Sequence, residues 1–229
     1  PLALQTENSD GQITLWTGRE LRPTQNLGVP SKIDHTDSGQ RWVSFEEGML
    51  MFWSIDQEQG TSKRLPQSKI QSLALNHEGT IATILSDDGV VSAYRSYEYP
   101  VKEFIGLNGA RIKSMKISPD RQFLMLIDNQ GSIQSVNLAE GQVELTIPAT
   151  SSLNVDHAQW VGGMKPYILV SQKEKTSGNH LTQQKVTLHA AGEEPKTLFQ
   201  GAASVTRIFT SSAQAQVVLE RKGDRGRKA

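Results

Sequence analysis

Short stretches in which apolar and polar residues alternate follow one another along most of the chain. Such alternation puts every second side chain on the same side of an extended backbone and is typical of half-buried β-strands. It is clearest over 69–107, which predicts four strands separated by tight turns. The predicted strands of this stretch are residues 69–75, 80–85, 90–94 and 101–105. We therefore expect one antiparallel sheet of four short strands here.

The same pattern recurs with a period near forty residues. Four glycines, each opening a short apolar run, mark the period with spacings of 37, 41 and 42 residues, at Gly11, Gly48, Gly89 and Gly131. Glycine suits the hairpin between two strands because it adopts positive φ angles without steric conflict. A repeat of this length built from short strands is typical of β-propeller blades. We predict an all-β β-propeller with about five four-stranded blades, either closed within this chain or part of a larger ring.

We interpret residues 1–229 as a single propeller domain. Its units are predicted at about 1–30, 31–68, 69–107, 110–149, 153–200 and 203–229, with a polar insert at 171–184. Two closures are open: residues 203–220 pair with residues 10–27 to complete a blade, or the ring is larger. The expected core is formed by Ile33, Val43, Leu50, Phe52, Leu73, Leu75, Ile81, Ile84, Ile117, Leu124 and Leu126.

These units resemble the blades of WD-repeat and WD-like propellers over most of the chain. The Ser-Pro-Asp turn at Ser118, the Asp-Gly hairpins and the aromatic residues at Trp16, Trp53 and Tyr94 lie where that family places them. The family's Gly-His pair is missing from every unit, and neither tryptophan is followed by Asp. The resemblance implies a divergent bacterial WD-like propeller, and such propellers are chiefly docking platforms for proteins.

A second resemblance is to the soluble propeller insert of bacterial phosphate ABC-transporter permeases. It rests on divergent Gln- and Ser-rich blades, the lack of cysteine, and chain ends at Pro1 and Ala229 that fall in mid-pattern. It implies a soluble domain excised from a larger membrane protein. We accordingly expect a periplasmic or membrane-tethered location rather than a cytoplasmic one.

Composition and motifs exclude several function classes. Lys plus Arg equals Asp plus Glu, at 24 each, and leaving out residues 220–229 gives 19 basic and 22 acidic residues, a net charge of −3. A chain with this negative net charge is unsuited to binding the phosphate backbone of a nucleic acid, so we expect no nucleic-acid partner. The lack of cysteine excludes disulfides and thiolate chemistry. The five histidines are scattered, and no nucleophile elbow or phosphate-binding loop occurs. We expect a non-enzymatic protein with no metal and no cofactor.

One charged pattern follows the repeat. Lys32, Lys69 and Arg111 each precede the first apolar residue of a predicted innermost strand, with spacings of 37 and 42 residues. Innermost strands of a propeller line its channel, so three cations at the channel mouth would favour a small anion such as a carboxylate or phosphate. A small-anion-binding or enzymatic propeller is the alternative function. In the competing interpretation, Lys32 pairs with Glu47, Lys69 with Asp88, and Arg111 with Asp128.

The last candidate is an aromatic pair at the predicted outer rim. Tyr97 and Tyr99 have the same parity, so an extended backbone presents both on one side. Aromatic side chains at a rim favour contact with a protein partner. Packing between neighbouring blades is the alternative role for the same residues.

Overall fold

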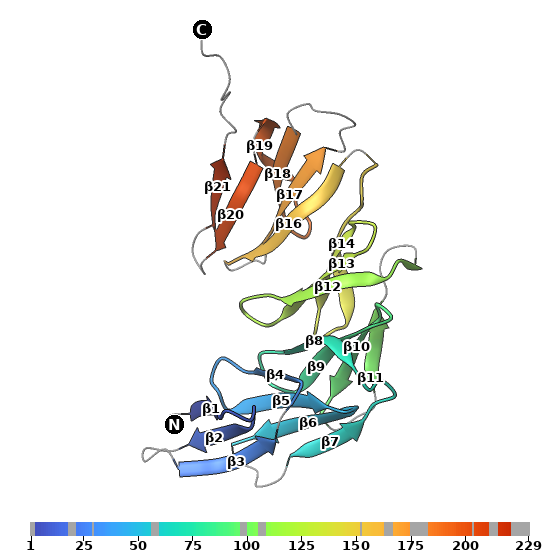
Figure 1. The fold of residues 1–229 in the computed structure, drawn as a ribbon. Coiled ribbons are helices and arrows are strands. Elements are labelled where there is room, and N and C mark those ends of the chain that lie inside the picture. The colour runs from blue at the N-terminus through green and yellow to red at the C-terminus, as the bar shows by residue number, and fades with distance from the viewer. Residues whose placement is uncertain are drawn as a thin grey trace.

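The fold is known from a computed structural model. It describes residues 3–17, 22–28, 30–55, 60–96, 100–104, 109–151, 153–162, 167–174, 183–202, 204–210 and 215–220. The described strands form six antiparallel sheets in series (Figure 1). Strands that are consecutive in sequence are hydrogen-bonded neighbours in each sheet, as expected when short hairpins join them. The predicted all-β fold of four-stranded units is confirmed.

The strands divide among the sheets as follows. The first sheet holds β1 (Ala3–Glu7), β2 (Ile13–Thr17) and β3 (Arg22–Gly28). The second holds β4 (Lys32–His35), β5 (Arg41–Glu46), β6 (Met49–Ser54) and β7 (Thr61–Arg64). The third holds β8 (Ile70–Leu75), β9 (Ile81–Ser86), β10 (Val91–Arg95) and β11 (Pro100–Phe104).

The remaining sheets continue the series. The fourth holds β12 (Ile112–Ile117), β13 (Phe123–Asp128), β14 (Ile133–Asn137) and β15 (Gln142–Ile147). The fifth holds β16 (Leu153–Val161), β17 (Tyr167–Glu174), β18 (Gln183–His189) and β19 (Lys196–Ala202). The sixth holds β20 (Ser204–Thr210) and β21 (Ala215–Glu220).

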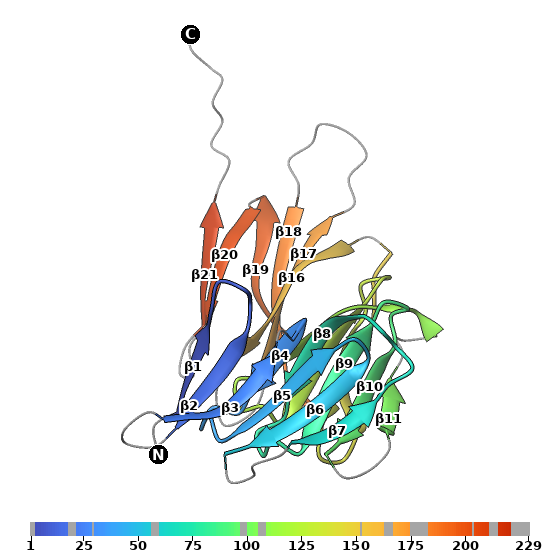
Figure 2. The same ribbon diagram turned by 60° about the horizontal axis from the view of Figure 1, so that its bottom comes forward.

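The six sheets follow one another in an arc (Figures 1 and 2). First strands of successive sheets are neighbours: β4 lies beside β8, β8 beside β12, and β16 beside β20. The first and sixth sheets are separate in the described residues, so the first of the two possible closures, in which 203–220 pair with 10–27, is not formed there. Strand β1 already pairs with β2, as a second strand does with a third, and so occupies the position that β21 would need.

Two constraints explain why glycine recurs at the hairpins where one sheet meets the next. Gly48 and Gly89 have φ angles of 82° and 81°, which side chains disfavour. The Gly48 carbonyl accepts the amide of Leu65 at 2.7 Å, in the segment leading to the third sheet, and the Gly89 carbonyl accepts that of Ile112 at 2.8 Å, the first residue of β12. A Cβ atom on Gly89 would stand 2.6 Å from the Cβ of Arg111. Each hairpin is thus pressed against the backbone that follows it.

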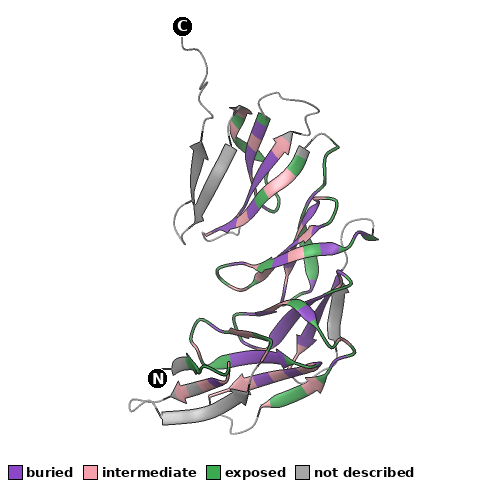
Figure 3. Cartoon of the chain, in the orientation of Figure 1, coloured by how far each residue is buried: buried purple, intermediate pink, exposed green. Residues whose placement is uncertain are grey.

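The core lies between neighbouring sheets rather than within one. All six residues of β9 are buried because both faces of the third sheet are covered (Figure 3). Ile84 packs with Phe45 and Leu50 of the second sheet, whereas Leu85 packs with Leu124 of the fourth. Among the expected core residues, Ile33, Leu73 and Ile117 are partly buried and the other eight are buried. Stacked sheets therefore share their apolar surface pairwise, as propeller blades do.

The predicted polar insert at 171–184 is wrong at both of its ends. Strand β17 runs on to Glu174 and β18 begins at Gln183, so only 175–182 lie outside the described residues. Ser171 and Gln184 are buried, and the Gln184 amide donates to the Ser171 hydroxyl at 2.5 Å. Polar residues are tolerated inside a sheet when they satisfy one another in this way, and composition alone did not reveal that pairing.

Candidate functional site

The three predicted cations lie at equivalent places. Lys32 opens β4, while Lys69 and Arg111 directly precede β8 and β12, and all three residues are exposed. They share the end of the innermost strands that faces the hairpins of Gly48 and Gly89. The structure thus brings them to one face of the arc, which we call the hairpin face.

The expected ion pairs are absent from this face as far as the described residues go. None of the three cations lies within 4 Å of a described carboxylate. The pKa of Asp88 is lowered, mainly because the Ser86 hydroxyl and the Val90 amide donate to its carboxylate, with a smaller contribution from the charge of Arg111. The charge of Arg111 thus acts on Asp88 of the preceding sheet.

Asp128 is a turn residue, as the hairpin pattern suggests. Its Oδ1 accepts the amides of Gln130 at 2.9 Å and Ser132 at 2.8 Å, and the residue is 2% exposed. Tyr97 and Tyr99, the predicted protein-contacting pair, lie outside the described residues. Tyr94 is buried among residues of the second and third sheets.

The opposite end of the strands, which we call the turn face, carries an ionic clamp that the sequence did not reveal. Arg121, in the turn between β12 and β13, reaches Asp34 of the second sheet. Its Nη1 donates to Asp34 Oδ2 at 2.9 Å and its Nη2 to Asp34 Oδ1 at 3.2 Å. Its Nε donates to Asp37 Oδ1 at 2.9 Å. These two acids raise the pKa of Arg121 against the effect of its burial.

The clamp also includes backbone groups of the third sheet, which lies between the second and the fourth. Arg121 Nη1 donates to the carbonyl of Leu75 at 2.8 Å, and the amide of Leu75 donates to Asp34 Oδ2 at 2.7 Å. Arg121 and Asp34 thus satisfy the carbonyl and the amide of Leu75 at the end of β8, where the sheet has an open edge. Side chains from the second and fourth sheets and the backbone of the third meet at one point.

A faint signal in the sequence marks this position. Turns after the first strands align at Thr36, Asn76 and Ser118, so Asp34 and Lys116 hold the same place in their sheets. Both bond the first strand of the next sheet, because Lys116 Nζ donates to the carbonyl of Ala158 at 2.8 Å. At this place a charged residue interrupts the apolar alternation of the strand. That interruption is the sequence signal that could have predicted these contacts between sheets.

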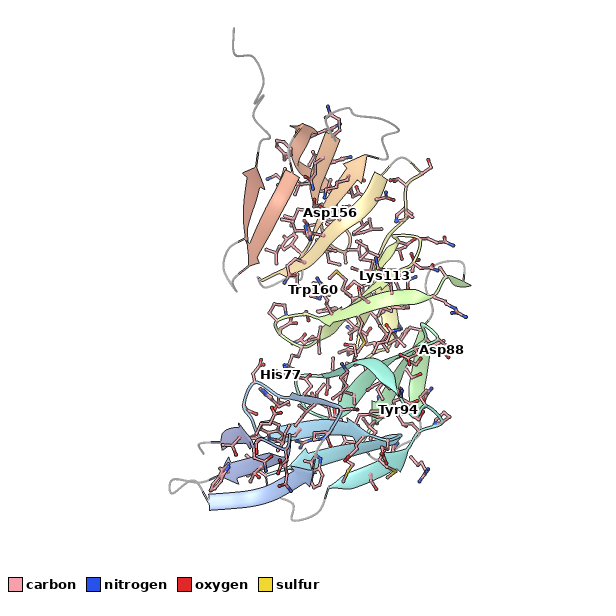
Figure 4. The ribbon with its side chains drawn as sticks, in the orientation of Figure 1. His77, Asp88, Tyr94, Lys113, Asp156 and Trp160 are labelled. Atoms are coloured by element: carbon pink, nitrogen blue, oxygen red, sulfur yellow. The ribbon has the colours of Figure 1, made fainter. Side chains whose placement is uncertain are left out.

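Two of the grooves lined by described residues lie on the turn face, each between two neighbouring sheets. The larger, of about 430 Å³, lies between the third and fourth sheets and is lined among others by His77, Glu78, Arg95 and Arg121. The smaller, of about 290 Å³, lies between the second and third sheets and is lined among others by Arg41 and Trp53. Figure 4 shows His77 and Asp88 at opposite ends of the third sheet, one on each face.

Two kinds of functional feature are absent from the described ranges. They contain no group of three or more His, Asp or Glu residues that could hold a metal ion. Nor do they contain a helix with the length and apolar character needed to cross a membrane.

Comparison with known proteins supports the fold alone. No protein-family model and no curated protein matches the sequence. Kuenenia stuttgartiensis hydrazine synthase aligns over 83% of this chain and 60% of its own, with a TM-score of 0.52 and 16% identity. KlHsv2 with loop 6CD replaced by a Gly-Ser linker aligns over 85% and 68%, with a TM-score of 0.56 and 12% identity. The C-terminal WD40 domain of Sif2 gives a TM-score of 0.49 at 12% identity, over 85% and 65%.

The solved structures that the chain resembles and the order of its own sheets indicate the same fold. The chain folds as four-stranded antiparallel sheets in series, which is the arrangement of β-propeller blades, and this fold is similar to those of the hydrazine synthase and KlHsv2 structures. It spans less than two thirds of the hydrazine synthase chain that it matches. Because such folds host unrelated activities, the fold leaves the function open, and the surface of this chain is what bears on it.

Proposed function

We propose that this propeller is a non-enzymatic interaction module that binds a protein partner. The main support is the pair of grooves on the turn face, between sheets whose shared core fixes their walls. A rigid concave surface loses little entropy when it binds a partner. WD-like propellers, which the sequence resembles, act chiefly in this way.

A quantitative capture experiment tests the proposal. The wild-type chain and an Arg41→Glu/Glu78→Lys variant, both tagged, would be used as baits in the source cells. We expect a protein enriched by the wild-type bait to be depleted with a variant altered on its binding face. Equal recovery with the propeller and with an unrelated tagged domain would refute the interaction role.

We also propose that the module is carried by a larger bacterial membrane protein, such as a phosphate ABC-transporter permease. This rests on the sequence resemblance described above. Reading the parent gene tests it: apolar spans on both sides of residues 1–229 would support the proposal. A complete reading frame without such spans would refute it.

A second candidate is a small-anion site on the hairpin face. The observation that favours it is the exposure of Lys32, Lys69 and Arg111 without a described carboxylate within 4 Å. Like charges at one face raise the local potential for an anion. Calorimetry with inorganic phosphate would compare the wild type with Lys69→Ala/Arg111→Ala. Unchanged affinity, or no binding to the wild type, would exclude this site.

A further inference from the structure

The outermost strands of the sheets differ in how regularly they pair with the strand beside them. At β3, β11, β15 and β19 the register of this pairing shifts at one or two places. Strand β7 pairs with β6 without a shift, from Thr61 opposite Phe52 to Arg64 opposite Met49. Bulges at a sheet edge hinder the addition of another strand. Among the outermost strands that the structure describes, β7 therefore has the edge best suited to strand addition.

The outer edge of β7 presents backbone groups to solvent. The Leu65 amide donates to the carbonyl of Gly48, the residue opposite it, at 2.7 Å. Because bonded and non-bonded pairs alternate along an antiparallel ladder, Ser62 and Arg64 turn their amides and carbonyls away from β6. Both residues are exposed. Their outward backbone groups are therefore open to a further strand.

The smaller groove of the turn face reaches this edge at one end. Thr61, the first residue of β7, lines the groove together with Trp53. The Trp53 indole is partly exposed, and its Nε1 donates to the Ser44 hydroxyl at 3.0 Å, which holds the ring. An apolar side chain packs favourably on such a ring, because the ring needs no ordering on binding.

Arg64 places a charge at the other end of the edge. No described carboxylate lies within 4 Å of its side chain, those of Glu46 and Glu47 in the neighbouring hairpin included. Strand β7 itself contains no acidic residue. A charged side chain on an edge strand opposes indiscriminate pairing and favours an added segment of opposite charge.

We propose that the outer edge of β7 binds an extended acidic segment of a partner protein as a fifth strand of the second sheet. The proposal rests on the interaction role proposed above and names its surface and its partner. In an antiparallel addition, an acidic residue lies opposite Arg64, and an apolar residue three positions later lies opposite Thr61, at the smaller groove. The first and third residues of this stretch bond the backbones of Arg64 and Ser62.

Fluorescence anisotropy with labelled synthetic peptides tests the strand addition. The probe has the sequence Glu-Thr-Val-Leu between Gly-Ser flanks. N-methylation of its Glu and Val removes the two amides that face β7, whereas N-methylation of its Thr and Leu removes two that face away. We expect the first modification to weaken binding about tenfold or more and the second to leave the affinity near that of the probe. Equal affinities of the two methylated peptides, or no binding of the probe, would overturn the proposal.

Variants of the protein test the same edge from the other side. Ser62→Pro removes an outward amide and leaves the ladder with β6 intact, so it should weaken binding about tenfold. Arg64→Glu should weaken binding of the probe about tenfold and favour a peptide with lysine in place of glutamate. This exchange of preference keeps the test decisive if Ser62→Pro does not fold, and its absence would overturn the proposal.

A matched control and the capture experiment complete the test. Lys196→Glu makes the same charge change at an exposed position of β19, an edge with a register shift, and should leave the affinity unchanged. Equal weakening by Lys196→Glu and Arg64→Glu would overturn the proposal. A partner captured equally by the wild-type and Arg64→Glu baits would refute this docking edge while upholding the interaction role.

Discussion

Removing the Arg121 side chain should destabilise the propeller far more than removing an exposed arginine. The side chains of Arg121 and Asp34 are 14% and 20% exposed and share two hydrogen bonds. Opposite charges about 4 Å apart attract by about 4 kcal/mol at an effective dielectric constant near 20. Desolvation opposes part of this attraction, which leaves a coupling of about 2 kcal/mol between the two side chains.

A double-mutant cycle isolates that coupling. Arg121→Ala, Asp34→Ala and the double variant would be unfolded in urea, with circular dichroism and tryptophan fluorescence as probes. Arg121→Ala should lower the free energy of unfolding by about 3 kcal/mol, because the bond to the Leu75 carbonyl is lost as well. The positive φ of 56° at this residue is equally unfavourable for arginine and alanine, so backbone strain cancels in the comparison.

Asp37 provides the matched control for the same cycle. It also accepts a bond from Arg121, but its side chain is 59% exposed, where ion pairs contribute about 0–1 kcal/mol. We expect the coupling of Arg121 with Asp37 to be at least about 1 kcal/mol smaller than that with Asp34. Equal couplings, or a coupling with Asp34 indistinguishable from zero, would refute the clamp.

Three further predictions concern other parts of the fold. Gly89→Ala should lower the free energy of unfolding by about 2–4 kcal/mol, because the added Cβ both disfavours the positive φ and collides with close neighbours. Gly192→Ala should lower it by only about 1–2 kcal/mol, because its φ is also positive, at 73°, but the surrounding space is open. Equal losses in thermal unfolding would contradict the close approach at Gly89. Ser86→Ala should raise the pKa of Asp88 toward its ordinary value, as followed by NMR titration of the carboxyl carbon, because the main donor is removed; an unchanged pKa would show that the hydroxyl is not responsible. Burial and a nearby lysine lower the pKa of His189 in the fold; the unfolded chain therefore takes up the proton first, and stability falls as pH drops below about 6.5. His189→Gln should remove that part of the slope in urea midpoints, and an identical slope would contradict it.

The strands and their grouping could be predicted from the sequence because they rest on local physics. Alternation at 70–75 or 112–117 and positive φ at Gly48 or Gly89 are properties of a few neighbouring residues. The period then assigns strands to sheets. Tertiary context changed the strand bounds at places such as Ser171, a polar residue that lies inside a strand because a residue on the next strand satisfies its buried hydroxyl.

The clamp and the grooves could not be predicted in the same way. Arg121 and Asp34 are 87 positions apart and meet only because the packing of three successive sheets brings the turn after β12 close to β4. Arg121 also has a left-handed backbone, with φ of 56°, which nothing in a Ser-Pro-Asp-Arg sequence requires. The ion pairs considered for Lys32, Lys69 and Arg111 are also not formed among the described residues, and the Asp128 carboxylate instead accepts amides of its own turn.

The span of Arg121 has a consequence for how this propeller loses its structure. In an array of repeats that touch only their immediate neighbours, the units can melt one at a time from either end. Arg121 joins a unit to the next but one, by way of the backbone of the unit between. The second, third and fourth blades should consequently exchange their most protected amide hydrogens as one cooperative block.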